Sequence, residues 1–378
     1  MHLNSFIKHL KTYLTIGEYS LRFIGNKERL VDWIYSIIKN NNIKGKVFFD
    51  FFSGTSNVGK FFKEKDYQVI SSDLLYFSYV LQRAYLVNNK TPSFDKLIDE
   101  ITIKSTLLAA DNYQQIVEYL NQLAPKKGFI YQNYAPNQTQ YLEKPRMYFT
   151  DNNAQKIDAI RIKIEEWKNR KLIDKNEYYI LLATLIETIG YFSNILGVYG
   201  AFKKDWDKRA LKPFLLKPIQ IITSQKEHFV YNKSSLELLE KYKYDIIYLD
   251  PPYNQRQYAP NYHILETIAK YDNPKIKGVS GMRSYDNQKS TFCNKIKALN
   301  DLEFICKSNN YNYIIMSYSR EGIMPQNNIL NIMKKYGDVK LEEYDYLRFK
   351  SNSHKDNSDK KFIKEQLYIL TNKTYNKS

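Results

Sequence analysis

Four short runs of nearly continuous apolar residues place the strongest constraint on the fold of this chain. They lie at residues 46–52, 68–73, 245–250 and 313–317 and are rich in β-branched and aromatic side chains. Because apolar residues occupy successive positions and do not alternate with polar ones, both faces of each strand should be buried. Helical patterns lie between the runs, so the sequence predicts an α/β fold: an open sheet with helices on both faces.

The stretch between the second and third runs has a different pattern, typical of helices. Apolar residues recur at spacings of three and four through 157–167, and 177–193 forms a second, more apolar helical segment. We therefore predict a sheet domain made of residues 1–100 and 223–378, with a mostly helical insertion at 101–222. The breaker-rich, basic segment 273–290 is predicted to be a mobile surface loop.

The chain is strongly basic, with 57 Lys and Arg against 40 Asp and Glu, a formal charge of +17. A surplus of this size favours a polyanionic partner, because clustered cations release counterions from a phosphate backbone. An AT-rich coding sequence would also enrich Lys, Asn, Tyr and Ile, so composition alone leaves the question open. Within the insertion, the candidates for phosphate contact are Lys203, Lys204, Lys208 and Arg209, and a solvated basic face is the alternative.

Several classes of protein are disfavoured by composition. The two cysteines, Cys293 and Cys306, do not make a disulfide framework or a four-cysteine zinc site, and the five histidines are scattered, so we expect no metal. Residues 1–20 lack the pattern of a signal peptide, and no run of 18 apolar residues occurs. We expect a cytoplasmic protein with no membrane association, and a monomer.

The tetrad Asp250, Pro251, Pro252 and Tyr253 directly follows an apolar strand. Ligands of open α/β sheets bind outside the carboxyl ends of the strands. The Asp carboxylate and the first proline carbonyl would present two acceptors on a rigid turn, which matches the two donors of an exocyclic amino group on a nucleobase. The Tyr ring offers a face for a base flipped out of the duplex. A capped turn at a strand end explains the same four residues equally well.

Two further groups of residues favour a catalytic site at this tetrad over a purely structural turn. Residues 50–59, Asp-Phe-Phe-Ser-Gly-Thr-Ser-Asn-Val-Gly, form a strand, a small-residue turn and the start of a helix, where backbone can approach a ligand closely. Asp73 ends the next strand, where an acidic residue is placed to bind ribose hydroxyls or to cap a helix. Residues 23–27, Phe-Ile-Gly-Asn-Lys, open a further helix that runs through Leu30, Ile34 and Ile37.

These three constellations, in this order, resemble the Dam-like DNA-adenine N6-methyltransferases in their alpha arrangement. Further segments resemble the type II modification-methylase branch of that family, and together they cover roughly residues 15–372: 146–150, 197–201, 254–258, 261–263, 316–322 and 346–350. The resemblance implies a Rossmann-like methyltransferase sheet, S-adenosylmethionine as cofactor, double-stranded DNA as substrate and the insertion as target-recognition region. It also implies restriction–modification, with a separate cognate endonuclease as a possible partner.

The resemblance also implies roles for single residues. Phe23 and Lys27 would line the methionine end of the cofactor, Asp73 would hold its ribose, and Tyr253 would pack on the target adenine. The cofactor would be wrapped by Phe52, Gly54 and Thr55, and methyl transfer would take place at Asp250. The chain departs from the family pattern at two positions, where Ser56 replaces a second glycine and Ser234 replaces an acidic residue.

The sequence leaves several alternative functions to be weighed against adenine methylation. Cytosine C5 methylation needs a cysteine nucleophile, usually after a proline, and neither cysteine follows one. DNA cytosine N4 methylation and RNA adenine methylation share the amino-group chemistry, although the long insertion favours a reader of duplex DNA. A non-catalytic nucleic-acid-binding protein of the same fold is a further alternative. Arg256 would either fill the gap left by the flipped base or hold a phosphate.

Overall fold

The computed structural model describes residues 21, 23, 25, 27–101, 111–347 and 362–375. The chain divides into two compact units. Unit 1 contains Arg83–Ile222 and Tyr262–Ser284, together with residues 21 and 23, and unit 2 contains Gly25–Gln82, Thr223–Asn261 and Tyr285–Ser378, as far as these ranges are described.

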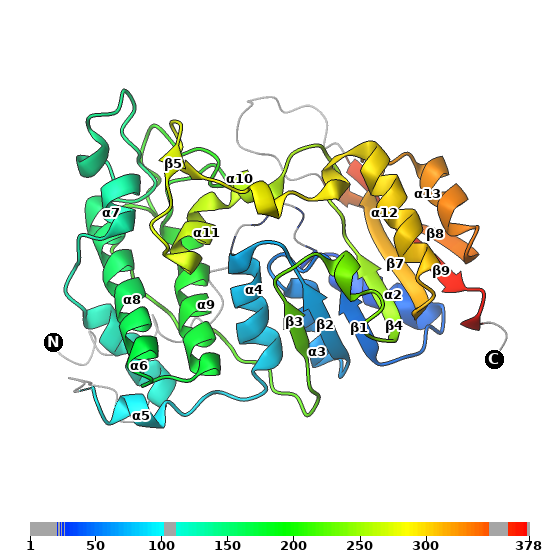
Figure 1. Cartoon of the computed structure of the whole chain (residues 1–378), viewed down its shortest axis with the longest axis horizontal. Coiled ribbons are helices and arrows are strands. Elements are labelled where there is room, and N and C mark those ends of the chain that lie inside the picture. Colours follow the sequence, from blue (N-terminus) through cyan, green and yellow to red (C-terminus); the bar gives the residue numbers. More distant parts are fainter. Residues whose placement is uncertain are drawn as a thin grey trace. The chain divides into compact units, whose positions relative to one another are not determined.

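Unit 2 is built on a seven-stranded sheet, seen in Figure 1, with the order β3-β2-β1-β4-β7-β9-β8. The first five strands of this order are parallel, whereas β9 runs antiparallel to both β7 and β8. All four predicted strands are confirmed. The strands are β1 (Val47–Asp50), β2 (Gln68–Ser72), β3 (Phe229–Tyr231), β4 (Tyr244–Leu249), β7 (Tyr311–Ser319), β8 (Gly337–Leu347) and β9 (Phe362–Asn372).

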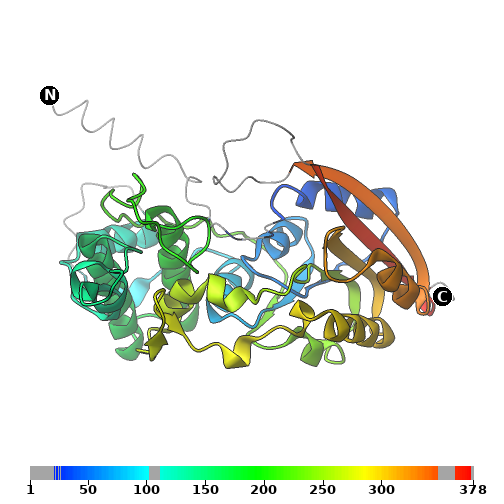
Figure 2. The ribbon, with the colours of Figure 1, turned by 90° about the horizontal axis from the view of Figure 1, so that it is seen from above.

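Helices cover both faces of this sheet, as the sequence predicts. Phe48 points to the face that carries α3 and stacks on Phe62 at 3.7 Å between ring centroids, and Tyr35 of α2 packs edge-on against Phe62. The next residue, Phe49, belongs to the core of the opposite face, with residues from α12 and α13. Figure 2 shows α2 and α12 on opposite sides of the sheet. The helices of unit 2 are α2 (Val31–Asn40), α3 (Asn57–Glu64), α4 (Tyr76–Gln82), α10 (Tyr258–Asn261), α12 (Lys295–Lys307) and α13 (Gln326–Met333), with short turns η3 (Ser235–Leu238), η4 (Asp286–Gln288) and η5 (Thr291–Cys293).

Unit 1 is largely helical. The two helices predicted from apolar spacing are confirmed as α8 (Asp151–Asn169) and α9 (Lys175–Phe192), which pack on each other. A capping box at Asp174 and Glu177 starts α9, and nearly every residue of that helix is buried. The other helices and helical turns in the described part of unit 1 are η1 (Arg83–Val87), α5 (Asp95–Ile98), α6 (Asn112–Gln122), α7 (Phe129–Tyr134), η2 (Asn137–Thr139) and α11 (His263–Lys270).

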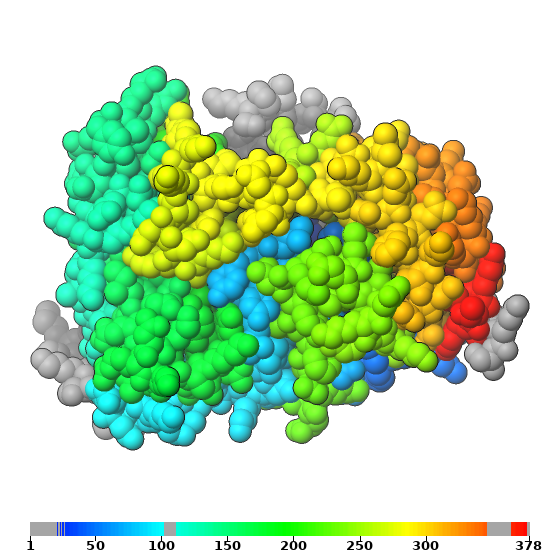
Figure 3. All heavy atoms as spheres, in the orientation of Figure 1, coloured from blue at the N-terminus to red at the C-terminus, as the bar shows by residue number. Residues whose placement is uncertain are grey.

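The expected coil after residue 273 is instead a β-hairpin, formed by β5 (Ile276–Lys277) and β6 (Met282–Arg283). Arg146 is buried beneath its tip and donates hydrogen bonds to the carbonyls of Val279 and Gly278 at 3.0 Å each. In Figure 3 the yellow part of the chain, which includes the hairpin, lies against teal residues of the same unit. Glycine and proline content correctly marks the turn, but it carries no sign of the arginine that orders it.

No helix within the described residues is long and apolar enough to cross a membrane.

Phe62 provides a test of the packing between α3 and the sheet. Its side chain is fully buried and stacks on Phe48. We expect Phe62→Ala to lower the free energy of unfolding by about 3–5 kcal/mol, because the change leaves a cavity that the stacked ring cannot fill. Chemical denaturation measures this change. The matched control is Phe304→Ala, since Phe304 is 53% exposed on α12 and its removal should cost below about 0.5 kcal/mol.

Candidate active site

The predicted site residues of unit 2 come together at the carboxyl ends of neighbouring parallel strands. Strand β1 ends at Asp50, β2 is followed by Asp73, and β4 is followed by Asp250. In the sheet β1 lies between β2 and β4, with Asp50 opposite Tyr248 of β4 and Ser71 of β2. The order of strands reverses between β1 and β4, which is where open α/β sheets bind ligands. The sheet topology therefore places three carboxylates at one edge.

The small-residue turn after β1 is held by Asp73. The N–H of Gly54 donates to Oδ2 of Asp73 at 2.9 Å, while Oδ1 accepts from the N–H of Leu75 at 2.8 Å. The hydroxyl of Ser78 on α4 donates to the carbonyl of Gly54. One carboxylate thus caps the turn before α4 and also fixes the loop that would wrap a ligand. Asp73 stands three positions before α4 begins at Tyr76, so it closes the turn that leads into the helix, and its binding of ribose stays a prediction.

Ser56 adopts the left-handed backbone conformation that a glycine would favour, with φ at 66°. This residue stands where the family usually has its second glycine. A side chain in this conformation costs about 1–2 kcal/mol. The Ser56 hydroxyl is buried and has no hydrogen-bond partner among the described residues. The loop therefore keeps the turn despite the substitution and leaves a polar group inside it.

Lys27 is buried between two carboxylates. Its ammonium nitrogen lies 3.3 Å from Oδ1 of Asp250 and 2.5 Å from Oε1 of Glu365 on β9. Ser317 of β7 donates a hydrogen bond to the same Glu365 oxygen at 2.7 Å. Burial alone would lower the pKa of Lys27, but the two carboxylates outweigh it and raise that pKa above its usual value. Lys27 is therefore a permanent cation in this cluster.

Asp250 keeps one oxygen free. Its side chain is 21% exposed, Lys27 contacts Oδ1, and Oδ2 has no partner among the described residues. Burial raises the pKa of Asp250 to about 6; Lys27 opposes this rise and Glu365 adds to it. The carboxylate is thus mostly ionised at neutral pH. An ionised oxygen at the rim of the site is a strong hydrogen-bond acceptor.

The residues that follow Asp250 are held in place by burial and by a backbone hydrogen bond. Pro251 and Pro252 are buried, and the carbonyl of Tyr253 accepts the N–H of Ile323 at 3.0 Å. The Tyr253 ring is partly buried against the core of the sheet. Arg256 is exposed, and its carbonyl accepts a hydrogen bond from the thiol of Cys293. The tetrad is therefore rigid at its base, with Arg256 reaching into solvent.

The other predicted cofactor residues are spread over both units. In unit 2, Phe52 is partly buried and meets Phe292 edge-on at 5.0 Å, and Thr55 is buried in the turn. In unit 1, Phe23 stacks on Tyr262 with ring centroids 4.5 Å apart.

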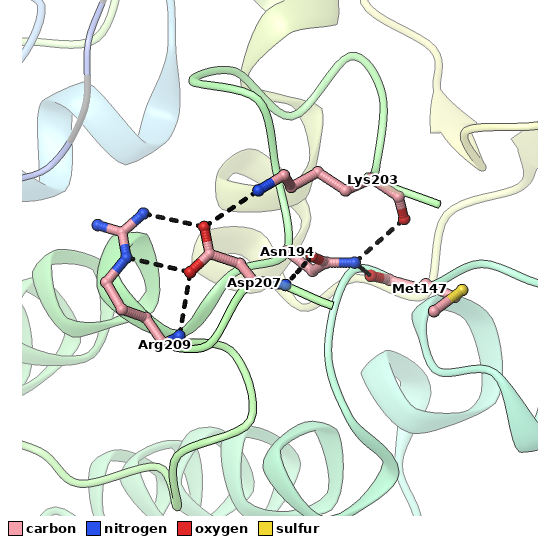
Figure 4. Close-up of polar contacts among 5 residues, drawn as sticks. All are labelled: Met147, Asn194, Lys203, Asp207 and Arg209. Carbon is pink, nitrogen blue, oxygen red and sulfur yellow. Dashed lines mark hydrogen bonds and ion pairs between the residues drawn. The ribbon is translucent and has the colours of Figure 1, made fainter. Parts of the chain in front are cut away.

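The basic residues predicted to contact phosphate fall into two groups. Figure 4 shows Lys203 and Arg209 both paired with Asp207, each at 3.3 Å. The hydrogen bond from Arg209 is the largest of the effects that lower the pKa of Asp207 below its usual range. Asn194, also drawn in Figure 4, accepts the N–H of Asp207 and donates to the carbonyls of Lys203 and Met147. Lys204 and Lys208 are exposed and have no ion pair among the described residues.

Three of the segments that resemble the modification branch meet in the core of unit 1. Tyr148 and His263 both hydrogen-bond to the carbonyl of Tyr199, each at 2.9 Å. The rings of Tyr148 and His263 meet edge-on at 5.9 Å. Burial lowers the pKa of His263 to about 4, so the imidazole is neutral. These segments therefore build the frame of unit 1.

Both cysteines are buried inside unit 2. Burial raises the pKa of Cys293 to about 11 and that of Cys306 to about 12. Thiols with such pKa values are poor nucleophiles at neutral pH. This agrees with the sequence-based argument against cytosine C5 chemistry.

Glu365 and Ser317 are the residues of the cluster that sequence reasoning did not single out for a role. Ser317 lies in a segment noted only for its resemblance to the modification branch. Glu365 stands in a polar stretch between the apolar residues 362–363 and 367–370, so the sequence does not set it apart from Lys364 and Gln366. Its burial on β9 is visible only in the structure.

With this geometry in place, comparison with known proteins identifies the family. Residues 23–336 match the family described as D12 class N6 adenine-specific DNA methyltransferase. This chain belongs to that family. Membership implies S-adenosylmethionine as methyl donor, and the Rossmann-like fold predicted from the sequence is confirmed.

The family contains type II modification enzymes that are similar to this chain over most of its length. The type II methyltransferase M.FokI of Planomicrobium okeanokoites is 41% identical over 343 residues, 90% of this chain and 51% of that protein. The type II methyltransferase M.NlaIII of Neisseria lactamica is 38% identical over 91% of this chain and 98% of that protein. The modification methylase StsI of Streptococcus sanguinis is 37% identical over 95% of this chain and 53% of that protein. The chain thus spans about half the length of two of these relatives and nearly all of the third.

Asp50 offers a test of the electrostatics of this site. It is buried, and burial raises its pKa to about 7; the N–H of Gly59, which donates to its Oδ2 at 3.2 Å, opposes the rise and Asp250 adds to it. The folded protein therefore holds this proton more tightly than the unfolded chain does. The resulting stabilisation is present at low pH and is lost as the pH rises through about 7.

We expect Asp50→Asn to gain stability relative to the wild type between pH 5 and pH 8, by on the order of 1–3 kcal/mol. Unfolding free energies measured at both pH values test this. Asp66→Asn is the control, because the Asp66 side chain is 69% exposed. A stability difference for Asp50→Asn that does not change with pH would contradict the assigned ionisation.

Proposed function

We propose that this chain transfers a methyl group from S-adenosylmethionine to the N6 amino group of a flipped adenine in double-stranded DNA. The observation that carries the proposal is the free Oδ2 of Asp250, an ionised acceptor on a rigid turn at the switch point of the sheet. Family membership and the type II relatives support the reaction class. By the same comparison we propose that the chain is the modification enzyme of a restriction–modification system, with a separate cognate endonuclease.

Asp250 would make the amino nitrogen of adenine a better nucleophile. The lone pair of an adenine amino group is delocalised into the ring, so its nitrogen is a poor nucleophile. An acceptor at Asp250 and a second at the carbonyl of Pro251 would draw the two hydrogens out of plane and localise the lone pair toward the methyl carbon. The carboxylate would also stabilise the positive charge that develops on nitrogen, and it requires no reorganisation because Lys27 and the prolines already fix it.

The residues present fit a positively charged methyl donor. Asp50, Asp73 and Asp250 stand at the ends of three adjacent strands, and of these three Asp250 is the one paired with Lys27. An excess of carboxylate favours a cationic ligand. Asp73 would hold the ribose, with Phe52, Gly54 and Thr55 around the cofactor and Phe23 and Lys27 at its methionine end. When bound, the cofactor supplies the activated methyl group.

DNA contact is proposed for the helical region 101–222 and for Arg256. The pairing of Lys203 and Arg209 with Asp207 reduces the charge that these two residues can offer to phosphates. Lys204 and Lys208 are exposed and carry uncompensated charge, so they are the stronger candidates. Phosphate contacts of this kind would position the duplex while other groups read bases.

The decisive experiment is incubation with isotopically labelled S-adenosylmethionine and plasmid DNA, with RNA in parallel, followed by mapping of the modified base. We expect label in DNA at N6 of adenine, and we expect Asp250→Ala to reduce the rate by about 100-fold or more while DNA and cofactor still bind. Lys27 keeps Glu365 as a partner in this variant, so the fold should survive. Label in RNA or at cytosine N4, or turnover of Asp250→Ala within a few-fold of wild type, would refute the assignment.

The two exposed lysines allow a test of the proposed DNA surface. We expect the double variant Lys204→Ala/Lys208→Ala to bind DNA with a shallower salt dependence, the logarithmic slope falling by about 0.9 for each phosphate that the variant no longer neutralises. Fluorescence anisotropy across a salt series measures this slope. A matched control removes the same charge at Lys46 and Lys335, which pair with Asp66 and Glu303 outside residues 101–222. Equal slopes for both double variants would exclude Lys204 and Lys208 as phosphate contacts.

A further inference from the structure

Lys27 is shared unequally between its two carboxylates. The ammonium nitrogen lies 2.5 Å from Glu365 and 3.3 Å from Asp250, so it is anchored on the residue that the proposed reaction does not use. The Glu365 side chain is only 9% exposed, and the Ser317 hydroxyl holds the same oxygen from the adjacent strand. This anchor is built into the sheet, because β9 pairs with β7 along its length.

The unequal sharing has a chemical consequence. A lysine paired only with Asp250 would approach that carboxylate fully, and its strong charge-assisted hydrogen bonds would compete with a substrate amino group. Removing the lysine would instead leave Asp250 buried and uncompensated, which favours its protonated form. Anchored on Glu365, Lys27 remains close enough to keep Asp250 ionised and leaves Oδ2 open.

We propose that Glu365, fixed by Ser317, is a positioning residue for methyl transfer: it holds Lys27 partly away from Asp250 and so keeps the Asp250 carboxylate available to the amino group. This inference rests on the function proposed above. Glu365 acts through Lys27, and Ser317 fixes its direction.

Other titratable groups surround this cluster. On β4, Tyr248 is buried and its pKa lies well above the usual value, so it stays neutral. On β1, burial raises the pKa of Asp50 to about 7, and the charge of Asp250 adds to this rise. Asp73 follows β2 and influences Asp50. Glu365 contributes to the pKa of Asp250 but is not among the causes of the shift of Asp50, so a change at Glu365 reports on Asp250.

The test is the pH profile of single-turnover methylation by Glu365→Gln. The amide keeps the shape but removes the charge, so Lys27 should move onto Asp250. We expect the plateau rate to fall by about 10- to 100-fold, the effect of a misplaced reacting group, while DNA affinity stays within about twofold. The acidic limb of the profile should move to lower pH, because loss of a neighbouring negative charge makes Asp250 more acidic. A purely structural role for Glu365 would lower the rate without moving this limb.

Three further variants make the test conclusive. Glu365→Asp retains the charge and should recover part of the rate with the wild-type acidic limb. Ser317→Ala loosens the anchor without changing any charge and should lower the rate less than Glu365→Gln does. Glu343→Gln is the matched control: Glu343 lies on neighbouring β8, pairs with Lys364 at 3.2 Å and should behave as wild type.

The outcomes separate the two proposals. A wild-type protein that methylates no adenine overturns the proposed function. A wild type that methylates DNA, with Glu365→Gln at a plateau rate within twofold and an unmoved acidic limb, overturns only the role of Glu365. If Glu365→Gln does not fold, as judged by its melting temperature, the plateau rate of Ser317→Ala decides, and a rate equal to that of the wild type would then overturn the role.

Discussion

The shared ion pair of Lys27 is the interaction on which the rest of the site depends. A buried ammonium group is tolerated only where carboxylates compensate it, since each unpaired buried charge costs several kcal/mol. Here the compensation comes from residues far apart in the chain: Glu365 is 338 positions from Lys27. The cluster therefore forms only when the sheet is complete, with β4 beside β7 and β9 in register against β7. Folding and site assembly are thus the same event.

Much of this arrangement could be predicted from the sequence. Nearly continuous apolar runs mark β1, β2, β4 and β7, because strands buried on both faces need no alternation of polar and apolar residues. The carboxylates at the ends of three of these strands then follow from topology, because parallel neighbours end at the same edge.

The partners of those residues could not be predicted in the same way. Glu365 reaches Lys27 because of the antiparallel register between β9 and β7, which no local pattern records. Likewise, the hairpin at β5 and β6 depends on Arg146, a residue more than a hundred positions earlier in the chain. Local periodicity predicts elements and strand ends, whereas long-range pairing decides which side chains meet.

Asp50 and Asp250 are the two buried carboxylates nearest the switch point, and a neighbouring cation makes their pKa values differ. Burial raises the pKa of both Asp50 and Asp250, yet Asp250 titrates about one unit lower, near 6 against 7. For Asp250 the largest opposing influence is Lys27, whereas Asp50 has no cation beside it among the described residues and accepts a hydrogen bond from the N–H of Gly59. An ionised carboxylate is a stronger acceptor for an amino group than a protonated one. The counter-charge of Lys27 therefore favours Asp250 over Asp50 for the role proposed above, in agreement with its place in the tetrad.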